Sequence, residues 1–173
     1  MPDATATTRQ ASLRDLPLIR RLAREIWLAH YPGILSMDQT EYMLARMYAL
    51  DVLREEMASG GVCFFLREGQ GGDALGFASV GPTAKRGESK LHKLYVQPSA
   101  QGRGHGYALL ETAAAQARSQ GSDSLSLCVN KRNEQAVAAY LRYGFTIRES
   151  IKVDIGGGYV MDDYVMAKTL DPG

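Results

Sequence analysis

Apolar residues recur along the chain with two periods, which predict an alternation of strands and helices. Helical spacing of three and four positions is found in four segments, at residues 15–27, 38–57, 107–120 and 133–142. Runs rich in β-branched and aromatic residues, typical of strands, lie at 5–11, 62–67, 74–80, 91–96, 125–129, 145–155 and 164–168. The predicted order is therefore one strand, two helices, three strands, a helix, a strand, a helix and two strands.

This order predicts a single α/β domain over residues 1–173. We expect a mixed, mostly antiparallel sheet of about seven strands flanked by about four helices, with parallel pairing needed only in the middle. A chain of 173 residues can bury a sizeable core, and no repeat, linker or low-complexity tract interrupts it.

The most informative stretch is a glycine turn between the strand at 91–96 and the helix at 107–120. Gly102, Gly104 and Gly106 leave the backbone bare just before a helix start, whose unpaired N–H groups favour an anion such as phosphate. No Lys-Ser/Thr pair follows the last glycine, as a P-loop requires, and the spacing is not Gly-x-Gly-x-x-Gly, as a dinucleotide fingerprint requires. The turn should lie outside the carboxyl end of the strand, where open α/β sheets bind ligands.

The spacing that does fit is Gln101-x-x-Gly104-x-Gly106. It resembles the pyrophosphate-binding signature of the GNAT superfamily of N-acetyltransferases, and the predicted order of elements is similar to that family over nearly the whole chain.

The stretch from Val129 to Phe145 resembles the second motif of that superfamily. Its matching residues include Asn133 and Tyr140, followed by a closing Gly-Phe pair. Taken alone, Asn133 is better interpreted as a helix cap and Tyr140 as a core aromatic residue. Two motifs at the expected separation favour the acetyltransferase interpretation.

The resemblance implies a fold, an activity and a set of site residues. It implies acetyl-CoA as co-substrate, with the backbone of 94–96 along the pantetheine arm and the glycine turn around the pyrophosphate. The residues implied in binding acetyl-CoA are Leu94, Tyr95, Val96, Gln101, Gly102, Arg103, Gly104, His105, Gly106, Asn133 and Tyr140.

The resemblance also implies a direct attack of an amine on the thioester, with Tyr140 as general acid. A phenol with an ordinary pKa of about 10 stays protonated and able to donate. Many family members carry a glutamate base where this chain has Lys90, so that role does not transfer. His92, where serotonin N-acetyltransferase has a strand histidine, is the candidate base; an exposed strand histidine is an equally good interpretation, and Glu88 is a further alternative.

The substrate is less well defined. Residues 157–166 and the Tyr42-Met43-Leu44 triplet resemble bacterial polyamine and small-amine acetyltransferases. We expect a small-molecule primary amine such as a polyamine, with a peptide or protein amine, or a non-catalytic CoA-binding regulatory module, as alternatives. Aromatic faces and a carboxylate suited to a cation are available in Trp27, Tyr31, Tyr42 and Asp162, with further candidates in Asp38, Glu41, Asp163 and Tyr159.

Composition restricts the partners. Twenty basic and 19 acidic side chains leave a net charge of +1, which gives no general attraction to nucleic acid or anionic lipid. The longest apolar run, 62–66, is too short to span a bilayer, so we expect a cytoplasmic protein without a membrane partner. A homodimer is an open alternative. Cys63 and Cys128 lie in strand-like runs and are expected to be small buried hydrophobic residues, and the two Cys and three His show no metal-ligand spacing.

Overall fold

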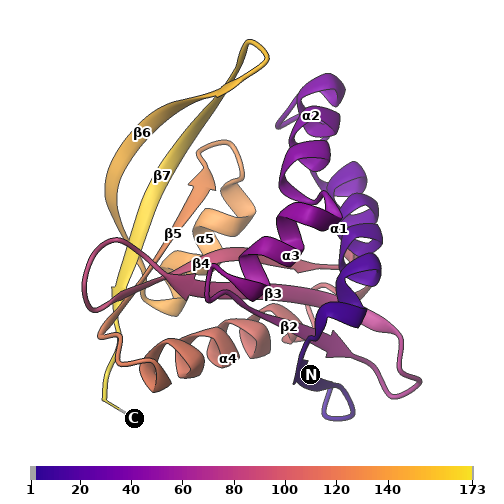
Figure 1. Cartoon of the computed structure of the whole chain (residues 1–173), viewed down its shortest axis with the longest axis vertical. Coiled ribbons are helices and arrows are strands. Elements are labelled where there is room, and N and C mark those ends of the chain that lie inside the picture. Colours follow the sequence, from indigo (N-terminus) through magenta and orange to yellow (C-terminus); the bar gives the residue numbers. More distant parts are fainter. Residues whose placement is uncertain (1–2, 173) are drawn as a thin grey trace.

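The computed structural model describes residues 3–172 and contains one seven-stranded sheet (Figure 1). Its order is β1-β2-β3-β4-β5-β7-β6, and only the β4–β5 pair is parallel, as the sequence predicts. The strands are β1 (Thr7–Gln10), β2 (Cys63–Glu68), β3 (Ala74–Pro82), β4 (Glu88–Val96), β5 (Ser124–Asn130), β6 (Thr146–Gly156) and β7 (Tyr159–Thr169).

Five α-helices cover the two faces of the sheet. One face carries α1 to α3, and the other carries α4 with α5 beside it (Figure 1). Their bounds are α1 (Leu16–His30), α2 (Met37–Met47), α3 (Leu50–Ala58), α4 (His105–Ser119) and α5 (Glu134–Tyr143). Two short 3₁₀ turns, Leu13–Asp15 and Pro98–Ala100, precede α1 and follow β4.

The helical segment expected at 38–57 is two helices. The chain leaves helical geometry at Tyr48, and α3 begins two residues later at Leu50. The break allows Tyr48, only 1% exposed, to pack edge-on against Trp27 of α1 with ring centroids 5.6 Å apart. Neither glycine nor proline marks this point, so the apolar spacing alone reads as one helix.

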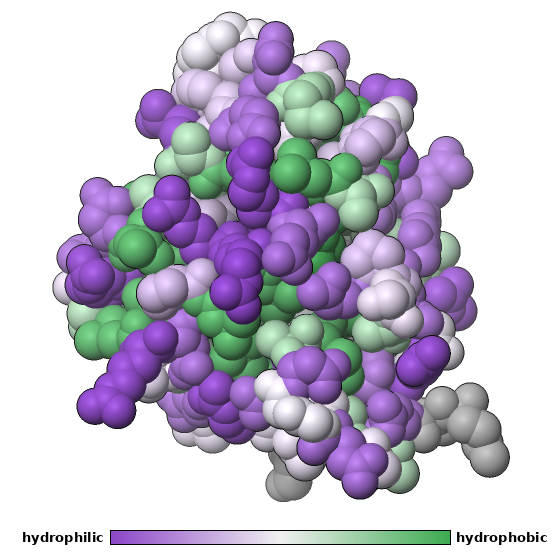
Figure 2. All heavy atoms as spheres, turned by 90° about the vertical axis from the view of Figure 1, so that its right-hand side faces the viewer, coloured by the Kyte–Doolittle hydropathy of each residue, from purple (hydrophilic) through white to green (hydrophobic). Residues whose placement is uncertain are grey.

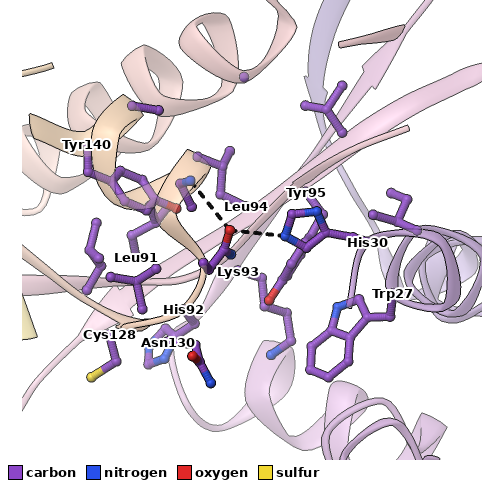
Figure 3. A pocket seen from close by; sticks show the side chains of 18 of the residues that line it. Trp27, His30, Leu91, His92, Lys93, Leu94, Tyr95, Cys128, Asn130 and Tyr140 are labelled. Atoms are coloured by element: carbon purple, nitrogen blue, oxygen red, sulfur yellow. Dashed lines mark hydrogen bonds between the residues drawn. The ribbon is translucent and has the colours of Figure 1, made fainter. Parts of the chain in front are cut away.

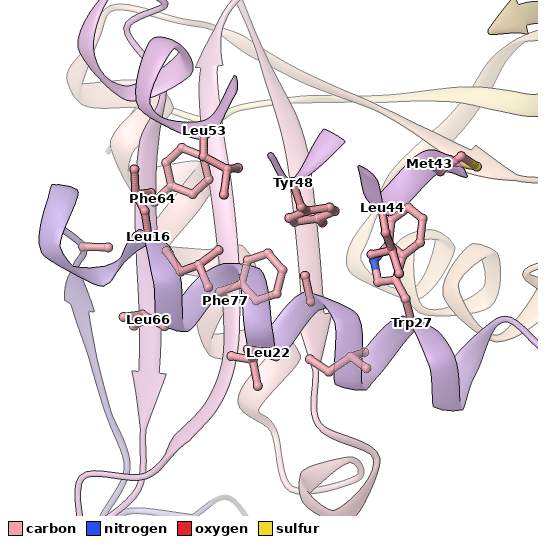
Figure 4. Packing of buried hydrophobic residues seen from close by; sticks show 14 of the residues in the cluster. Leu16, Leu22, Trp27, Met43, Leu44, Tyr48, Leu53, Phe64, Leu66 and Phe77 are labelled. Carbon is pink, nitrogen blue, oxygen red and sulfur yellow. The ribbon is translucent and has the colours of Figure 1, made fainter. Parts of the chain in front are cut away.

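Each face of the sheet has its own core. Under α1 to α3, Trp27, Tyr48, Phe64 and Phe77 interlock with leucines from the same helices and strands (Figure 4). On the other face, Leu109 and the alanines of α4 pack closely on β3, β4 and β5. The small alanine side chains let the helix backbone approach the sheet, which holds the start of α4 close to the end of β4.

The outer surface over α1 is largely hydrophilic, with apolar side chains showing between the polar ones (Figure 2). Within residues 3–172, no helix combines the length and apolar character needed to cross a membrane.

Candidate active site

The site is built around a bulge in β4. Neighbouring residues Ser79 and Val80 of β3 pair with Lys93 and Leu91, which leaves His92 as an extra residue in β4. Such a bulge bends a strand away from its neighbour. Parallel pairing of β4 with β5 ends at Leu91, opposite residue 127, whereas β5 continues to residue 130 alongside β7. The two central strands therefore diverge into a wedge.

One backbone edge of β4 faces this wedge. The N–H of Gln97 donates to the carbonyl of Leu75 on the β3 side at 2.8 Å. Because N–H and C=O groups of alternate residues point the same way, Leu94 and Val96 present theirs to the β5 side. The carbonyl of Val96 accepts there from the Gln101 side chain, Nε2 to O 3.2 Å. The wedge thus contains β4 backbone that no neighbouring strand pairs.

The glycine turn closes the wide end of the wedge. Gly102 and Gly104 have φ of 77° and 84°, which glycine adopts without strain, and Gly104 immediately precedes α4. The first helical hydrogen bond runs from the N–H of Ala108 to the carbonyl of Gly104, so the N–H groups of the first turn have no helical partner. A Cβ placed on Gly106 would reach 3.8 Å from Val96 Cγ2.

A cavity of about 1080 Å³ joins the wedge to the space between α1, α2 and the β6–β7 hairpin (Figure 3). It is of the size of a large ligand site. The structure brings most of the expected residues to its lining: Trp27, Tyr31, Tyr42, His92, Leu94, Tyr95, Val96, Gln101, Gly102, Gly104, His105, Gly106, Asn133 and Tyr140.

Two expected residues lie elsewhere. Arg103 is exposed and lines a separate, smaller pocket, and its carbonyl accepts from the N–H of Asp3. Asp162 is outside the cavity lining and pairs with Lys131 at 2.6 Å. The next residue, Asp163, lines the cavity instead, because adjacent strand residues point to opposite faces.

His105 reaches the lining but has a structural role for its side chain. The ring is 2% exposed, and its Nδ1 accepts from Arg67 Nε at 3.3 Å. Any contact of His105 with an anion at the turn would therefore use its backbone N–H.

Asn133 caps α5, as the simpler interpretation of the sequence holds. Its Oδ1 accepts the N–H of Ala136 at 3.4 Å and lies 3.1 Å from Nε2 of His30 at the end of α1. This bond ties α1 to α5 across the cavity. The sequence does not predict a role for His30, because a histidine at a helix end carries no pattern of its own.

Tyr140 projects from α5 with its hydroxyl toward the interior of the pocket (Figure 3). Its ring meets Phe145 edge-on at 5.6 Å, and no hydrogen bond of the hydroxyl is found within residues 3–172. Burial, with a smaller contribution from Tyr31, raises the pKa of Tyr140 above its ordinary value. The phenol is therefore held protonated and directed at open space.

The two candidate bases differ sharply. Burial of the His92 ring, with the charges of Lys90 and Lys93, lowers its pKa to about 4, so the imidazole is neutral at pH 7 although the residue keeps exposed surface. Glu88 is paired with Arg148 at 2.7 Å, which lowers its pKa to about 2. That pairing makes Glu88 a poor proton acceptor.

The aromatic residues form part of the core as well as the cavity wall. Trp27 is 1% exposed and packs against Tyr31 and Tyr95, whose hydroxyls lie 3.2 Å apart. Tyr42 donates to the carbonyl of Ile155 at 2.8 Å and packs with a tilted ring against Tyr159 at the start of β7, with ring centroids 4.9 Å apart. These contacts fix the wall opposite the wedge.

The expectation of two buried cysteines is wrong for Cys128. Cys63 is partly buried, whereas Cys128 is exposed and lines the cavity beside the wedge (Figure 3); both are free thiols. The strand period predicts which face a residue occupies, but here that face borders an open cavity instead of a core.

Comparisons with known proteins agree on one family. The profile described as "Acetyltransferase (GNAT) family" matches residues 20–145. Spermidine N(1)-acetyltransferase of Thermoplasma acidophilum is 26% identical over 145 residues, 82% of this chain and 89% of that protein. Mycothiol acetyltransferase of Streptomyces avermitilis is 32% identical over 122 residues, 70% of this chain but only 37% of its own length.

Solved structures share the fold. PaiA N-acetyltransferase from Thermoplasma acidophilum, in complex with coenzyme A, superposes with a TM-score of 0.78 at 23% identity and covers 95% of this chain and 98% of its own. A GCN5-related N-acetyltransferase from Rhodopseudomonas palustris gives 0.81 at 20% identity, with coverage of 98% and 99%. The family profile, with the wedge and the glycine turn it spans, shows that this chain belongs to the GNAT family of acetyltransferases.

Proposed function

We propose that this protein is an acetyl-CoA-dependent N-acetyltransferase that acts on a small primary amine. The observation that carries the proposal is the wedge between β4 and β5, which ends at the glycine turn and the free N–H groups of α4. The relatives named as acetyltransferases support the reaction class, and the spermidine N(1)-acetyltransferase supports an amine acceptor.

The residues present fit acetyl-CoA. The backbone of Leu94 and the N–H of Val96, which no neighbouring strand pairs, can bind the amide groups of the pantetheine arm as an added strand would. The open backbone at Gly102 and Gly104, at the positive end of the α4 dipole, suits the pyrophosphate. An added Cβ on Gly102 would meet nothing within 4 Å, so the turn presents free space to a ligand.

Acetyl-CoA supplies the acetyl thioester, and the chain supplies orientation and proton transfer. The N–H of Val96 points into the wedge, where it can donate to the oxygen on which negative charge develops. The protonated Tyr140 hydroxyl can donate to the departing thiolate. His92, neutral at pH 7, can accept a proton through water, although its low pKa makes it a weak base.

The test is turnover of acetyl-CoA, followed by thiol release, against a panel of polyamines, monoamines, amino acids, aminoglycosides and short peptides. Saturable turnover with a small amine supports the proposal. Turnover only with peptides would favour a peptide or protein acetyltransferase. Binding of acetyl-CoA without turnover of any amine would indicate a CoA-binding regulatory module and overturn the proposal.

A further inference from the structure

The Asp163 carboxylate is buried and has no hydrogen-bond or ion-pair partner within residues 3–172. It lies in β7 opposite Asn130 of β5 and is 5% exposed, and its side chain lines the cavity. Within residues 3–172, no hydrogen bond to the carboxylate is found, and Oδ1 is fully buried without a partner. The nearby cation of Lys131 does not neutralise Asp163, because it forms an ion pair with the neighbouring Asp162.

A buried, unpaired carboxylate is costly, and the local charges do not remove that cost. Burial and the adjacent Asp162 raise the pKa of Asp163 to about 6, while Lys90 of β4 and Lys131 act from a distance in the opposite direction. The group is therefore mainly ionised at pH 7. Tyr31, the residue that follows α1, also faces it and carries a hydroxyl already hydrogen-bonded to Tyr95.

Among the described residues that line the cavity, Asp163 and Glu56 are the acidic ones. The Glu56 carboxylate pairs with Nζ of Lys93 at 3.0 Å, whereas Asp163 has no such pair within residues 3–172. Beyond Asp163, the wall toward the β6–β7 turn is apolar, formed by Ile151, Val153, Ile155 and Met161. The charged groups of the lining on the α2 and β4 sides are positive.

Two of those positive groups limit what else can bind. Arg46 of α2 lies over the Tyr42 ring, 5.3 Å from its centroid, and Lys90 projects from β4 before the bulge. Both line the cavity, so a second positive charge on a ligand would meet like charges, whereas an apolar chain would meet the β6–β7 wall.

We propose that Asp163 binds the ammonium group of the acceptor, and that the acceptor is a monoamine with an apolar body rather than a polyamine. The proposal rests on the proposed function and specifies its substrate. Asp163 is opposite Asn130, three residues past the last β4–β5 pair, so the bound ammonium lies beside the wedge where the thioester is expected. A charge-assisted hydrogen bond in this buried place would replace the missing partner.

Calorimetric titration of hexylamine into the protein saturated with free coenzyme A measures binding of the ammonium group to Asp163, because free coenzyme A has no acetyl group to transfer. Asp163→Asn keeps the shape of the side chain and should weaken hexylamine binding by at least about tenfold. Asp162→Asn removes the same charge one residue away, outside the cavity, and should leave the affinity unchanged. Coenzyme A affinity should be the same in all three proteins.

Equal hexylamine affinity in the wild type and Asp163→Asn overturns the proposal, as does an absence of hexylamine binding to the wild type at millimolar concentration. Circular dichroism confirms that the variant is folded, and Asp163→Glu, which restores the charge, should recover part of the affinity.

Steady-state turnover then tests the substrate class with two amines of equal length. Hexylamine should have a kcat/KM at least about tenfold above that of 1,6-diaminohexane, because the diamine brings a second positive charge near Arg46 and Lys90. A diamine that is equal or better overturns the monoamine assignment. If acetyl-CoA binds but no amine is turned over, the proposed function fails, while the calorimetry still decides whether Asp163 binds an ammonium group.

Discussion

The Tyr140 ring packs against Phe145, and its hydroxyl makes no hydrogen bond within residues 3–172. Tyr140→Phe keeps the ring contacts and removes only the oxygen, so the KM for acetyl-CoA should hold while kcat falls, by roughly 10²-fold to 10⁴-fold for a general acid. Tyr164→Phe is a matched control, since Tyr164 packs outside the cavity lining. Full turnover in the Tyr140 variant would return it to a purely structural role.

The Asp163 carboxylate is expected to lower the stability of the free protein, although the same charge is proposed to bind the acceptor. Its pKa in the folded protein, about 6, lies above the ordinary 3.8, so the folded state binds the proton more tightly than the unfolded state. Stability of the free protein therefore falls as pH rises from about 4 to about 6 and stays lower above that range. Asp163→Asn should raise the free energy of unfolding near pH 7.5, on the order of 1 kcal/mol, and change it little near pH 4. Urea unfolding at the two pH values measures both, and a variant less stable than the wild type near pH 7.5 would contradict the prediction.

The pH dependence of kcat/KM separates Asp163 from His92. Ionisation of Asp163 should give an acid limb with an apparent pKa near 6, which Asp163→Asn abolishes and His92→Gln retains. A relay through His92 should instead appear as a limb near 4, because burial and the two neighbouring lysines lower its pKa. A limb near 6 that disappears in His92→Gln would assign the titration to the histidine.

At the scale of elements, the glycine turn is the feature that the sequence predicts best, and the structure refines how to test it. Gly104 needs its φ of 84°, so a β-branched residue there would strain the backbone as well as fill the site. Gly106→Val avoids that strain, because Gly106 lies inside α4 without a positive φ, and an added Cβ meets only Val96 Cγ2 at an ordinary 3.8 Å. Acetyl-CoA affinity should fall by at least about tenfold by calorimetry.

The control for this variant lies in the same helix. Ala115→Val introduces an equally branched side chain at an exposed position of α4, away from the cavity. It should leave acetyl-CoA affinity unchanged. Equal affinities of the Gly106 variant, the control and the wild type would refute binding at the turn.

Other elements show where sequence reasoning stops. The order of elements and the parallel β4–β5 pair follow from apolar periods and turn residues. The split between α2 and α3 does not, because Tyr48 leaves the helix to reach Trp27 and no local residue marks the change. The longer β7, which begins at Tyr159 instead of 164, carries Asp163 to the cavity, and only the register with β5 distinguishes it from Asp162.

Over the whole molecule, the sheet carries one core on each face. The site lies where the hydrogen-bonded pairing of β4 with β5 ends. The apolar period of each helix and strand indicates which of its residues can be buried, but the division into two cores becomes visible only in the structure. The period does not predict the wedge, which depends on the single extra residue His92 in β4. A bulge changes the pairing of a strand without changing its composition.

The wedge makes β4 a sheet edge in the middle of the fold, and amide hydrogen exchange should reveal it. In the free protein, the N–H groups of Leu94 and Val96 should exchange at least about tenfold faster than those of Lys93 and Tyr95, which face β3. Saturation with acetyl-CoA should slow the first pair and leave the second unchanged. Exchange measured residue by residue with NMR would thus show an alternating pattern along one strand, and uniform protection of all four amides before ligand is added would mean that the wedge is closed in solution.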